Sequence, residues 1–259
     1  MTGGTDAALG EALAEIVEEA GAAILPLWRH AALAVNRKAD ESPVTEADDR
    51  AEALILRRLA ERFSSLTVIA EEDANQFGTP DQIGPRFFLV DPLDGTKAFI
   101  RGEEHWTVNI GLIQDGRPVA GAVCAPAWGR TWHTTAGGAS RREIGKAPGE
   151  PIHVRAWPQG RAVCLISHTM KPEVEQELRA KYGYDQVLAM DSSAKICMVA
   201  EGTADIYPRH GTTMEWDIAA AHAVLEGAGG SLRTPDGAPF LYGKAADGFR
   251  NGWFVARGG

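Results

Sequence analysis

The strongest constraint in this sequence is the stretch FFLVDPLDGTKAF, residues 87–99, in which a short apolar run ends in two aspartates. Residues 87–90 are continuous, apolar and rich in β-formers, which predicts an interior strand. Asp91 and Asp94 follow where that strand leaves the core. A carboxylate beside a core is costly unless something compensates its charge. The turn therefore either exposes these aspartates to water or uses them to hold a cation.

The predicted elements follow different patterns in the first and second halves of the chain. Helical spacing of apolar residues predicts a first helix ended or kinked at Pro26, and a second helix over about 46–63. Strands are then predicted at 66–70, 86–91, 105–113, 118–126 and 130–136, with an Asp115-Gly116 hairpin turn. After residue 152 strands and helices alternate, which is typical of α/β layering. The Gly-rich, charged segment 137–151 is the predicted link between an N-terminal α+β half, residues 1–145, and a C-terminal α/β half, residues 152–259.

Composition excludes several classes of protein. With 259 residues, of which 44% are hydrophobic, the chain can bury a substantial core. No apolar run approaches the roughly 20 residues of a membrane span, and the N-terminus is acidic and amphipathic, so we expect a cytoplasmic protein and leave peripheral contact with the inner membrane open. A formal charge of −9 argues against a nucleic-acid polymer as partner. The scattered Cys124, Cys164 and Cys197 are expected to be reduced core thiols.

Four acidic features each have a structural explanation. Glu71 follows a predicted strand and fits a solvated turn. The motif DPLDGT fits an ordinary Asp-Gly turn. Asp48 fits a capping box with Thr45, and Asp217 lies in the first turn of a helix, where the helix dipole favours a carboxylate.

Taken together, the same carboxylates indicate a metal site. All of them stand at strand ends or helix starts, where different elements can converge. Mg²⁺ prefers oxygen ligands and is commonly shared between carboxylates and a substrate phosphate. Gly95 allows close approach of the backbone, and Thr96 begins a short helical turn whose free N–H groups can bind an anion. The residues therefore predict a metal-dependent phosphate site.

The motifs DPLDGTKAFI and WDIAAAHAV together resemble the paired signatures of the inositol monophosphatase superfamily of Mg²⁺-dependent, typically lithium-sensitive phosphatases. The resemblance extends from TEAD at 45–48, through AEED at 70–73, to the EGAGG that ends the Asp217 helix. It implies the layered αβαβα sandwich of that superfamily, with elements of both α+β and α/β type.

The resemblance also implies roles for individual residues. Two or three Mg²⁺ ions would be held by Glu71, Asp91, the backbone carbonyl of Leu93, Asp94 and Asp217. The reaction would be an in-line displacement by an activated water, without a phosphoenzyme. Asp48 and Thr96, with Glu71, would form the catalytic group that orients this water and accepts its proton.

The stretch SSAKICMVAEGTADIYPRHGTTMEWD is most similar to the 3'(2'),5'-bisphosphate nucleotidases of the CysQ type, which remove the 3'-phosphate of adenosine 3',5'-bisphosphate formed in sulfate assimilation. Lys195, Arg209 and Ser192 would bind the second phosphate and the ribose, and Gly95 and Thr96 would bind the phosphate that is removed. Inositol monophosphatases usually have an acidic residue near the position of Arg209, which argues against inositol phosphate as the main substrate.

The sequence is also compatible with other functions. A sister phosphatase acting on inositol phosphate, histidinol phosphate or fructose 1,6-bisphosphate would have the same fold. A metal-binding or interaction protein that has kept the fold and lost the chemistry is the alternative from another class. The expected partner is a small phosphate ester, and the oligomeric state is open, with a homodimer as one candidate. Trp106 and Trp132 are expected to pack in the core, while His168 is open between a surface role and a substrate contact.

Overall fold

The computed structural model describes residues 3–29, 35–37, 43–80 and 82–259. Within these residues the strands form two large sheets and two small ones. The larger sheet has the order β3-β4-β5-β6-β7-β8-β9, with β3 (Thr67–Ala70), β4 (Arg86–Asp94), β5 (Thr107–Gln114), β6 (Arg117–Ala125), β7 (Arg130–Thr135), β8 (Gly138–Glu143) and β9 (Glu150–Ile152). The second sheet has the order β11-β10-β12-β16-β14, with β10 (Val163–Ile166), β11 (Gln186–Ala189), β12 (Ile206–Arg209), β14 (Ser231–Arg233) and β16 (Phe254–Arg257). The small pairs are β1 (Val35–Arg37) with β2 (Pro43–Thr45), and β13 (Thr213–Met214) with β15 (Arg250–Asn251).

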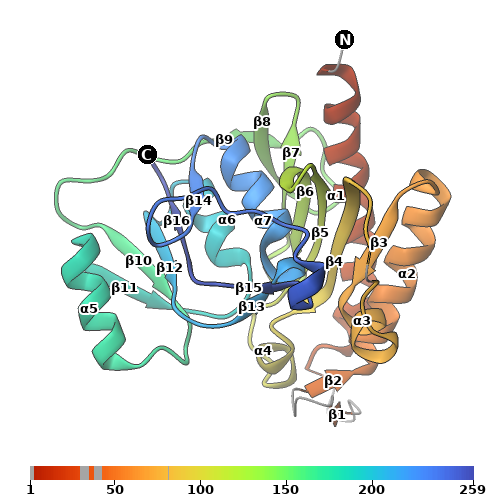
Figure 1. Cartoon of the computed structure of the whole chain (residues 1–259), viewed down its shortest axis with the longest axis horizontal. Helices are drawn as coiled ribbons and strands as arrows, with labels where there is room; N and C mark the ends of the chain where they lie inside the picture. Colours follow the sequence, from red (N-terminus) through yellow and green to blue (C-terminus); the bar gives the residue numbers. More distant parts are fainter. Residues whose placement is uncertain (1–2, 30–34, 38–42, 81) are drawn as a thin grey trace.

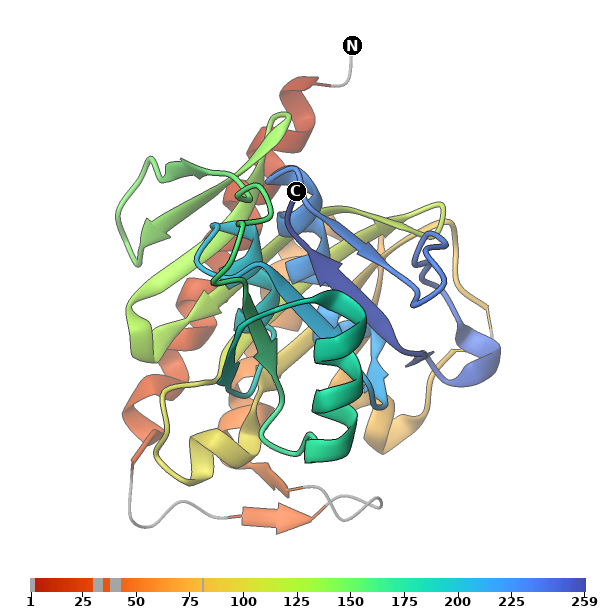
Figure 2. The same cartoon turned by 90° about the vertical axis from the view of Figure 1, so that its left-hand side faces the viewer.

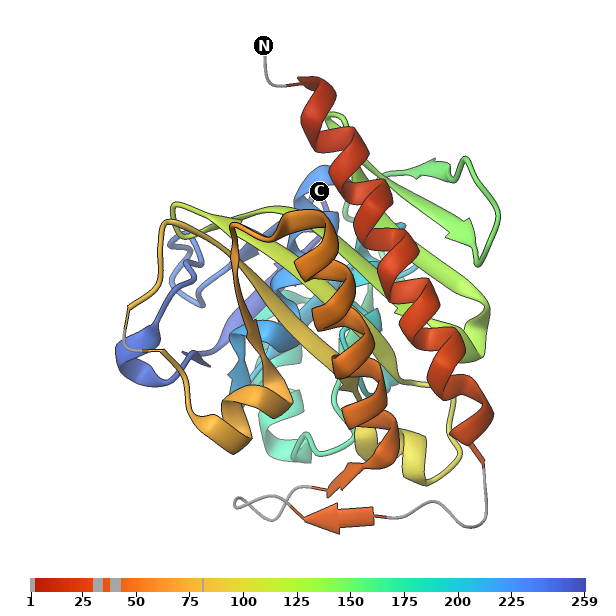
Figure 3. The ribbon, with the colours of Figure 1, turned by 90° about the vertical axis from the view of Figure 1, so that its right-hand side faces the viewer.

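Helices separate and cover the two large sheets (Figure 1). They are α1 (Gly3–Ile24), α2 (Glu46–Phe63), α3 (Glu71–Phe77), α4 (Thr96–Ile100), α5 (Pro172–Tyr182), α6 (Ala194–Ala200) and α7 (Glu215–Gly227), with 3-10 turns at Leu25–Leu27, Pro126–Trp128 and Ala245–Asp247. Figure 3 shows α1 and α2 side by side on the outer face of the larger sheet. Helices α6 and α7 lie between the sheets, and α5 covers the outer face of the second sheet (Figure 2). This arrangement confirms the predicted αβαβα sandwich.

Short sequence motifs correctly predicted several elements. Thr45 caps α2: its side chain accepts the Ala47 N–H, and the Asp48 side chain accepts the backbone N–H of Thr45 in return. The apolar stripe of this helix, including Ile55 and Leu59, is buried. Asp115 and Gly116 both have positive φ, 51° and 74°, which is the backbone of the tight turn that joins antiparallel β5 and β6.

Helix α7 packs unusually close to the larger sheet. A Cβ atom on Gly111 would lie 2.8 Å from the backbone nitrogen of Ala220, and one on Gly121 would lie 2.4 Å from its carbonyl oxygen. These glycines in β5 and β6 therefore let the helix backbone rest directly on the sheet. The start of α7, which carries Asp217, is thereby placed against the sheet whose strand β4 carries both Asp91 and Asp94.

The segment 137–151 is not a simple link, because it contains β8 and β9, which extend the larger sheet. One charged residue of this segment is buried, which its charge did not indicate. Arg142 in β8 is 6% exposed and forms ion pairs with Glu11 and Glu18 of α1. Strand β4 also runs farther than predicted, to Asp94, with a register shift between Asp91 and Asp94. The division of the chain into two halves remains a prediction.

Other expectations concern the core and the membrane. Cys124, Cys164 and Cys197 are buried free thiols, as predicted, and Trp106 and Trp132 are fully buried. None of the helices in the part of the chain that the structure describes has both the length and the apolar character that a membrane span needs.

Candidate metal centre

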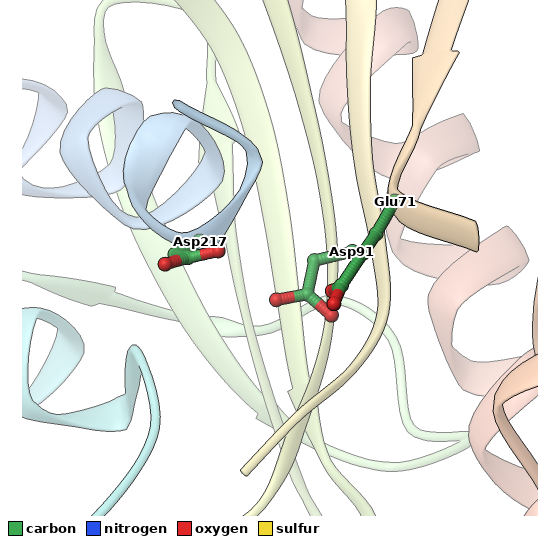
Figure 4. Close-up of side chains that lie close together, drawn as sticks. All are labelled: Glu71, Asp91 and Asp217. Carbon is green, nitrogen blue, oxygen red and sulfur yellow. The ribbon is translucent and has the colours of Figure 1, made fainter. Parts of the chain in front are cut away.

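Three carboxylates from three separate elements converge at one point (Figure 4). Oxygen atoms of Glu71, Asp91 and Asp217 all lie within 4.8 Å of one another. The first two meet because β3 and β4 are parallel and Ala70 is in register with Val90, so the next residue of each strand emerges at the same edge of the sheet. Glu71 also begins α3, a helix that was not predicted after this strand.

Asp217 approaches from the opposite side, at the start of α7. It is the third residue of the helix, and its Oδ2 accepts the backbone N–H of Met214 at 2.8 Å. This bond closes a capping box and fixes the carboxylate beside the positive end of the helix dipole.

The carboxylate cluster forms part of the wall of a cavity of about 420 Å³. Of the residues predicted from sequence, the cavity is lined by Glu71, Asp91, Leu93, Asp94, Gly95, Thr96, Ser192, Lys195, Arg209 and Asp217. The structure therefore brings ten of the eleven predicted site residues to one cavity. The eleventh, Asp48, is buried behind Thr96.

The chemistry of this donor set fits a hard divalent cation. Burial raises the pKa of Asp94 to about 6, against opposing attraction from Lys195 and the N–H of Ser193. Burial, together with the negative charges of Asp94 and Glu71, raises the pKa of Asp217 well above its ordinary value. Crowded, desolvated carboxylates of this kind are unfavourable alone and favourable around a cation that takes oxygen ligands.

Asp48 and Thr96 lie beside this cluster as a bonded pair. The Thr96 hydroxyl donates toward Asp48 Oδ1, 3.2 Å away, and toward the Leu93 carbonyl oxygen, 3.1 Å away. Asp48 Oδ2 accepts the backbone N–H and the hydroxyl of Thr45, both at 2.8 Å. The carboxylate is thus oriented by the cap of α2 and presents its other oxygen to Thr96.

Gly95 is required by its surroundings at the turn between β4 and α4. Its φ is 95°, in the left-handed region, and an added Cβ would lie 2.7 Å from the carbonyl oxygen of His105. A side chain here would be strained and would collide with backbone, so only glycine fits.

The two predicted cationic residues are arranged differently. Arg209 ends β12 and donates through Nη2 to the Thr212 carbonyl oxygen at 3.3 Å, while its buried Nε finds no hydrogen-bond acceptor among the described residues. Lys195 is 4% exposed, and its Nζ donates to the carbonyl oxygens of Met190 and Ser192 at 3.2 and 2.6 Å. The pKa of Lys195 is lowered to about 8, mainly by burial and to a smaller extent by the positive charge of Arg209, although Asp94 opposes the shift.

Two buried glutamates that support the site were missed from sequence. Glu52 of α2 accepts the N–H groups of Glu72 and Asp73, at 2.8 and 2.7 Å, and so holds the first turn of α3. Its signal was available, because it lies three residues before buried Ile55 on the apolar stripe of α2. Glu215 is fully buried and accepts the N–H groups of Gly243 and Lys244 at 2.8 and 3.0 Å.

His168, which sequence analysis left open, is about two-fifths exposed and pairs through Nδ1 with Asp191 at 3.4 Å. Asp191 also pairs with Arg101, at 2.9 Å. The His168 side chain thus lies at the surface in a cluster with Asp191 and with Arg101, the residue that follows α4.

This chain is similar to known proteins in both sequence and structure. Residues 7–250 match the model of the inositol monophosphatase family. The 3'(2'),5'-bisphosphate nucleotidase CysQ of Salmonella typhimurium is 38% identical over 233 residues, which cover 90% of this chain and 93% of that protein. The histidinol-phosphatase of Mycobacterium tuberculosis is 31% identical over 219 residues, covering 83% and 82%. Among solved structures, CysQ from Bacteroides thetaiotaomicron superposes with a TM-score of 0.79 and 30% identity, over 97% of both chains.

Proposed function

This chain belongs to the inositol monophosphatase family, and we propose that it is a Mg²⁺-dependent phosphomonoesterase that hydrolyses adenosine 3',5'-bisphosphate to AMP and phosphate. Water and the 3'-phosphate ester react to give the free 3'-hydroxyl and inorganic phosphate. The relatives named CysQ support this substrate, because they are 38% and 30% identical to this chain over most of its length.

The proposal rests on one observation: negatively charged carboxylates and a positively charged guanidinium line the same cavity. Its carboxylate wall is formed by Glu71, Asp91 and Asp217. The same cavity is lined by Arg209, whose buried Nε lacks an acceptor among the described residues. A ligand with two phosphates matches this arrangement: one phosphate is held at the metal site and the other accepts from the guanidinium.

We assign the cation ligands as Glu71, Asp91, the Leu93 carbonyl, Asp94 and Asp217. Together these groups would hold two or three Mg²⁺ ions. A bound divalent cation supplies an activated water and neutralises the charge on the phosphoryl oxygens. The number of ions can be counted by titrating the protein with Mn²⁺ and following the free ion by electron paramagnetic resonance.

The remaining steps belong to side chains of this chain. Thr96 orients the attacking water, and Asp48 accepts its proton through the Thr96 hydroxyl. Gly95 lets the backbone at the start of α4 approach the phosphate. Ser192 and Lys195 lie on the substrate side of the cavity. Because Lys195 already donates to two carbonyl oxygens, one of its three N–H groups is left for substrate.

The test is phosphate release from four esters in parallel: adenosine 3',5'-bisphosphate, inositol 1-phosphate, histidinol phosphate and fructose 1,6-bisphosphate. Each is assayed with Mg²⁺, with Mg²⁺ and Li⁺, and with chelator. We expect the highest kcat/KM for the nucleotide and no release in chelator. A higher value for another ester would keep the metal site and overturn the substrate.

Histidinol phosphate is the second candidate substrate, because a histidinol-phosphatase is 31% identical over 83% of this chain. It carries one phosphate, an ammonium group and an imidazole ring, so it offers no second anion for Arg209 to bind. If it is the true substrate, replacing Arg209 with alanine should leave its kcat/KM unchanged.

A further inference from the structure

Three buried polar side chains form a closed hydrogen-bonded ring beneath the carboxylates. The Ser193 hydroxyl donates to Asn109 Oδ1 at 2.7 Å, and Asn109 Nδ2 donates to the Thr107 hydroxyl at 3.3 Å. The Thr107 and Ser193 hydroxyls lie 2.9 Å apart. Because the Ser193 hydroxyl donates its only hydrogen to Asn109 Oδ1, the Thr107 hydroxyl is the donor in that pair. Each member thus donates one bond and accepts one, and all three are at most 3% exposed.

The ring lies directly beside two of the candidate ligands. In the antiparallel pairing of β4 with β5, Thr107 is in register with Asp94 and Asn109 with Asp91. Ser193 comes from the other side of the cavity, at the start of α6, and its backbone N–H donates to Asp94 Oδ2. The ring therefore ties the segment before α6 to the strand beneath the site.

The segment before α6 is itself held in a strained shape. Ser192 has a φ of 64°, a left-handed conformation that is unfavourable for a residue with a side chain. Lys195 Nζ donates to the carbonyl oxygens of Met190 and Ser192, and Ser192 Oγ accepts the Ala194 N–H at 3.3 Å. Without these bonds the turn would relax, and the direction of the Ser193 N–H would change with it.

We propose that Ser193 is a positioning residue that, anchored by Thr107 and Asn109, fixes the Asp94 carboxylate for cation binding. One oxygen of Asp94 is engaged by the Ser193 N–H, which leaves the other for a cation. Partners that orient a ligand in this way commonly change metal affinity by about 10-fold to 100-fold when they are removed. This inference rests on the proposed metal site but not on the identity of the substrate.

The test is cation binding by the protein without substrate. Calorimetric titrations with Mg²⁺ and with Mn²⁺ compare the wild type with Ser193→Ala, for which we expect dissociation constants raised about tenfold. The matched control is Ser140→Ala, which removes another buried serine hydroxyl, bonded to the Glu150 carbonyl oxygen in the outer part of the larger sheet. Its metal affinity should equal that of the wild type.

A second pair of variants keeps the test informative if Ser193→Ala does not fold. Thr107→Val removes the hydroxyl at nearly constant volume, and Thr107→Ser keeps it. We expect weakened binding in the first and recovery in the second. Unchanged Mg²⁺ and Mn²⁺ affinity in folded Ser193→Ala and Thr107→Val would overturn the proposal.

Assays with adenosine 3',5'-bisphosphate separate this inference from the proposed function. The Mg²⁺ concentration for half-maximal activity should rise in Ser193→Ala, while KM for the nucleotide at saturating Mg²⁺ stays unchanged. If the wild type releases no phosphate from the nucleotide but Ser193→Ala still weakens cation binding, the substrate assignment fails and the positioning role stands.

Discussion

Asp48 and Thr96 are 48 positions apart in the sequence, and the Thr96 hydroxyl lies 3.2 Å from Asp48 Oδ1 beside the carboxylate cluster. This contact joins the cap of α2 to the start of α4. It places a proton acceptor one hydroxyl away from the cavity.

Asp48→Asn should lower kcat for phosphate release by about 10²-fold to 10⁴-fold, because the general base is lost. The amide oxygen can still accept from Thr45, so α2 should stay capped, and Mg²⁺ affinity measured by calorimetry should change little. Thr96→Ser keeps the hydroxyl and is the control. An Asp48→Asn variant with wild-type kcat would remove this residue from the mechanism.

Arg209→Ala should raise KM for adenosine 3',5'-bisphosphate by about tenfold or more, because a charged hydrogen bond contributes about 1.5–3 kcal/mol. An ester with a single phosphate, such as p-nitrophenyl phosphate, should be affected far less. Arg233→Ala, outside the cavity, is the matched control. Equal losses for both esters would argue against binding of a second phosphate by Arg209.

Gly95→Ala should cost more stability than Gly129→Ala. Both glycines have left-handed backbones, with φ of 95° and 63°, but a Cβ on Gly129 meets nothing within 4 Å. The shared backbone strain is about 1–2 kcal/mol, and the collision at Gly95 should add about 1–3 kcal/mol. Urea unfolding of both variants measures the difference, and equal losses would show that the turn relaxes freely.

Mg²⁺ should stabilise the protein, by about 2.7 kcal/mol at a concentration 100 times the dissociation constant. Asp217→Asn should abolish most of this gain. In chelator the same variant should be more stable than the wild type at neutral pH, because burial and the neighbouring carboxylates raise the pKa of Asp217 and make its charged form unfavourable. Thermal unfolding with Mg²⁺ and with chelator tests both statements.

The contribution of His133 should lower the free energy of unfolding as the pH drops below about 6.5. Burial lowers the pKa of His133, and nearby Arg142 lowers it further, although its bond to the Thr134 carbonyl oxygen and the charge of Glu11 oppose the shift. Below the ordinary histidine pKa the unfolded chain therefore binds a proton that the folded chain does not, which favours unfolding.

The matching variant is His133→Gln. It should remove the His133 contribution and so lower the slope of the free energy of unfolding against pH between 7.5 and 5.5, by at most about 1.4 kcal/mol per pH unit for one proton. Identical slopes for variant and wild type would show that the folded protein protonates this residue as readily as the unfolded chain.

The sequence by itself determined the features that depend on short-range physics. The cap of α2 joins Thr45 to Asp48 within one helical turn, and the tight turn at Asp115 and Gly116 follows from two adjacent residues. The continuous apolar run at 87–90 located the interior strand that carries Asp91. These signals operate over a few residues, so no knowledge of the rest of the fold was needed to read them.

Only the tertiary structure decided which distant groups meet. The Ser193 N–H reaches Asp94 across 99 positions, and Glu52 holds the turn after Glu71, because sheet register and layer packing bring them together. Lys195 was predicted from its motif context to bind the substrate, whereas its Nζ also donates to two backbone carbonyl oxygens. Within the predicted link, residues 138–143 and 150–152 form strands, because pairing with neighbouring strands and ion pairs with α1 outweigh their weak local propensity. Such contacts depend on the packing of the whole chain, which no short stretch encodes.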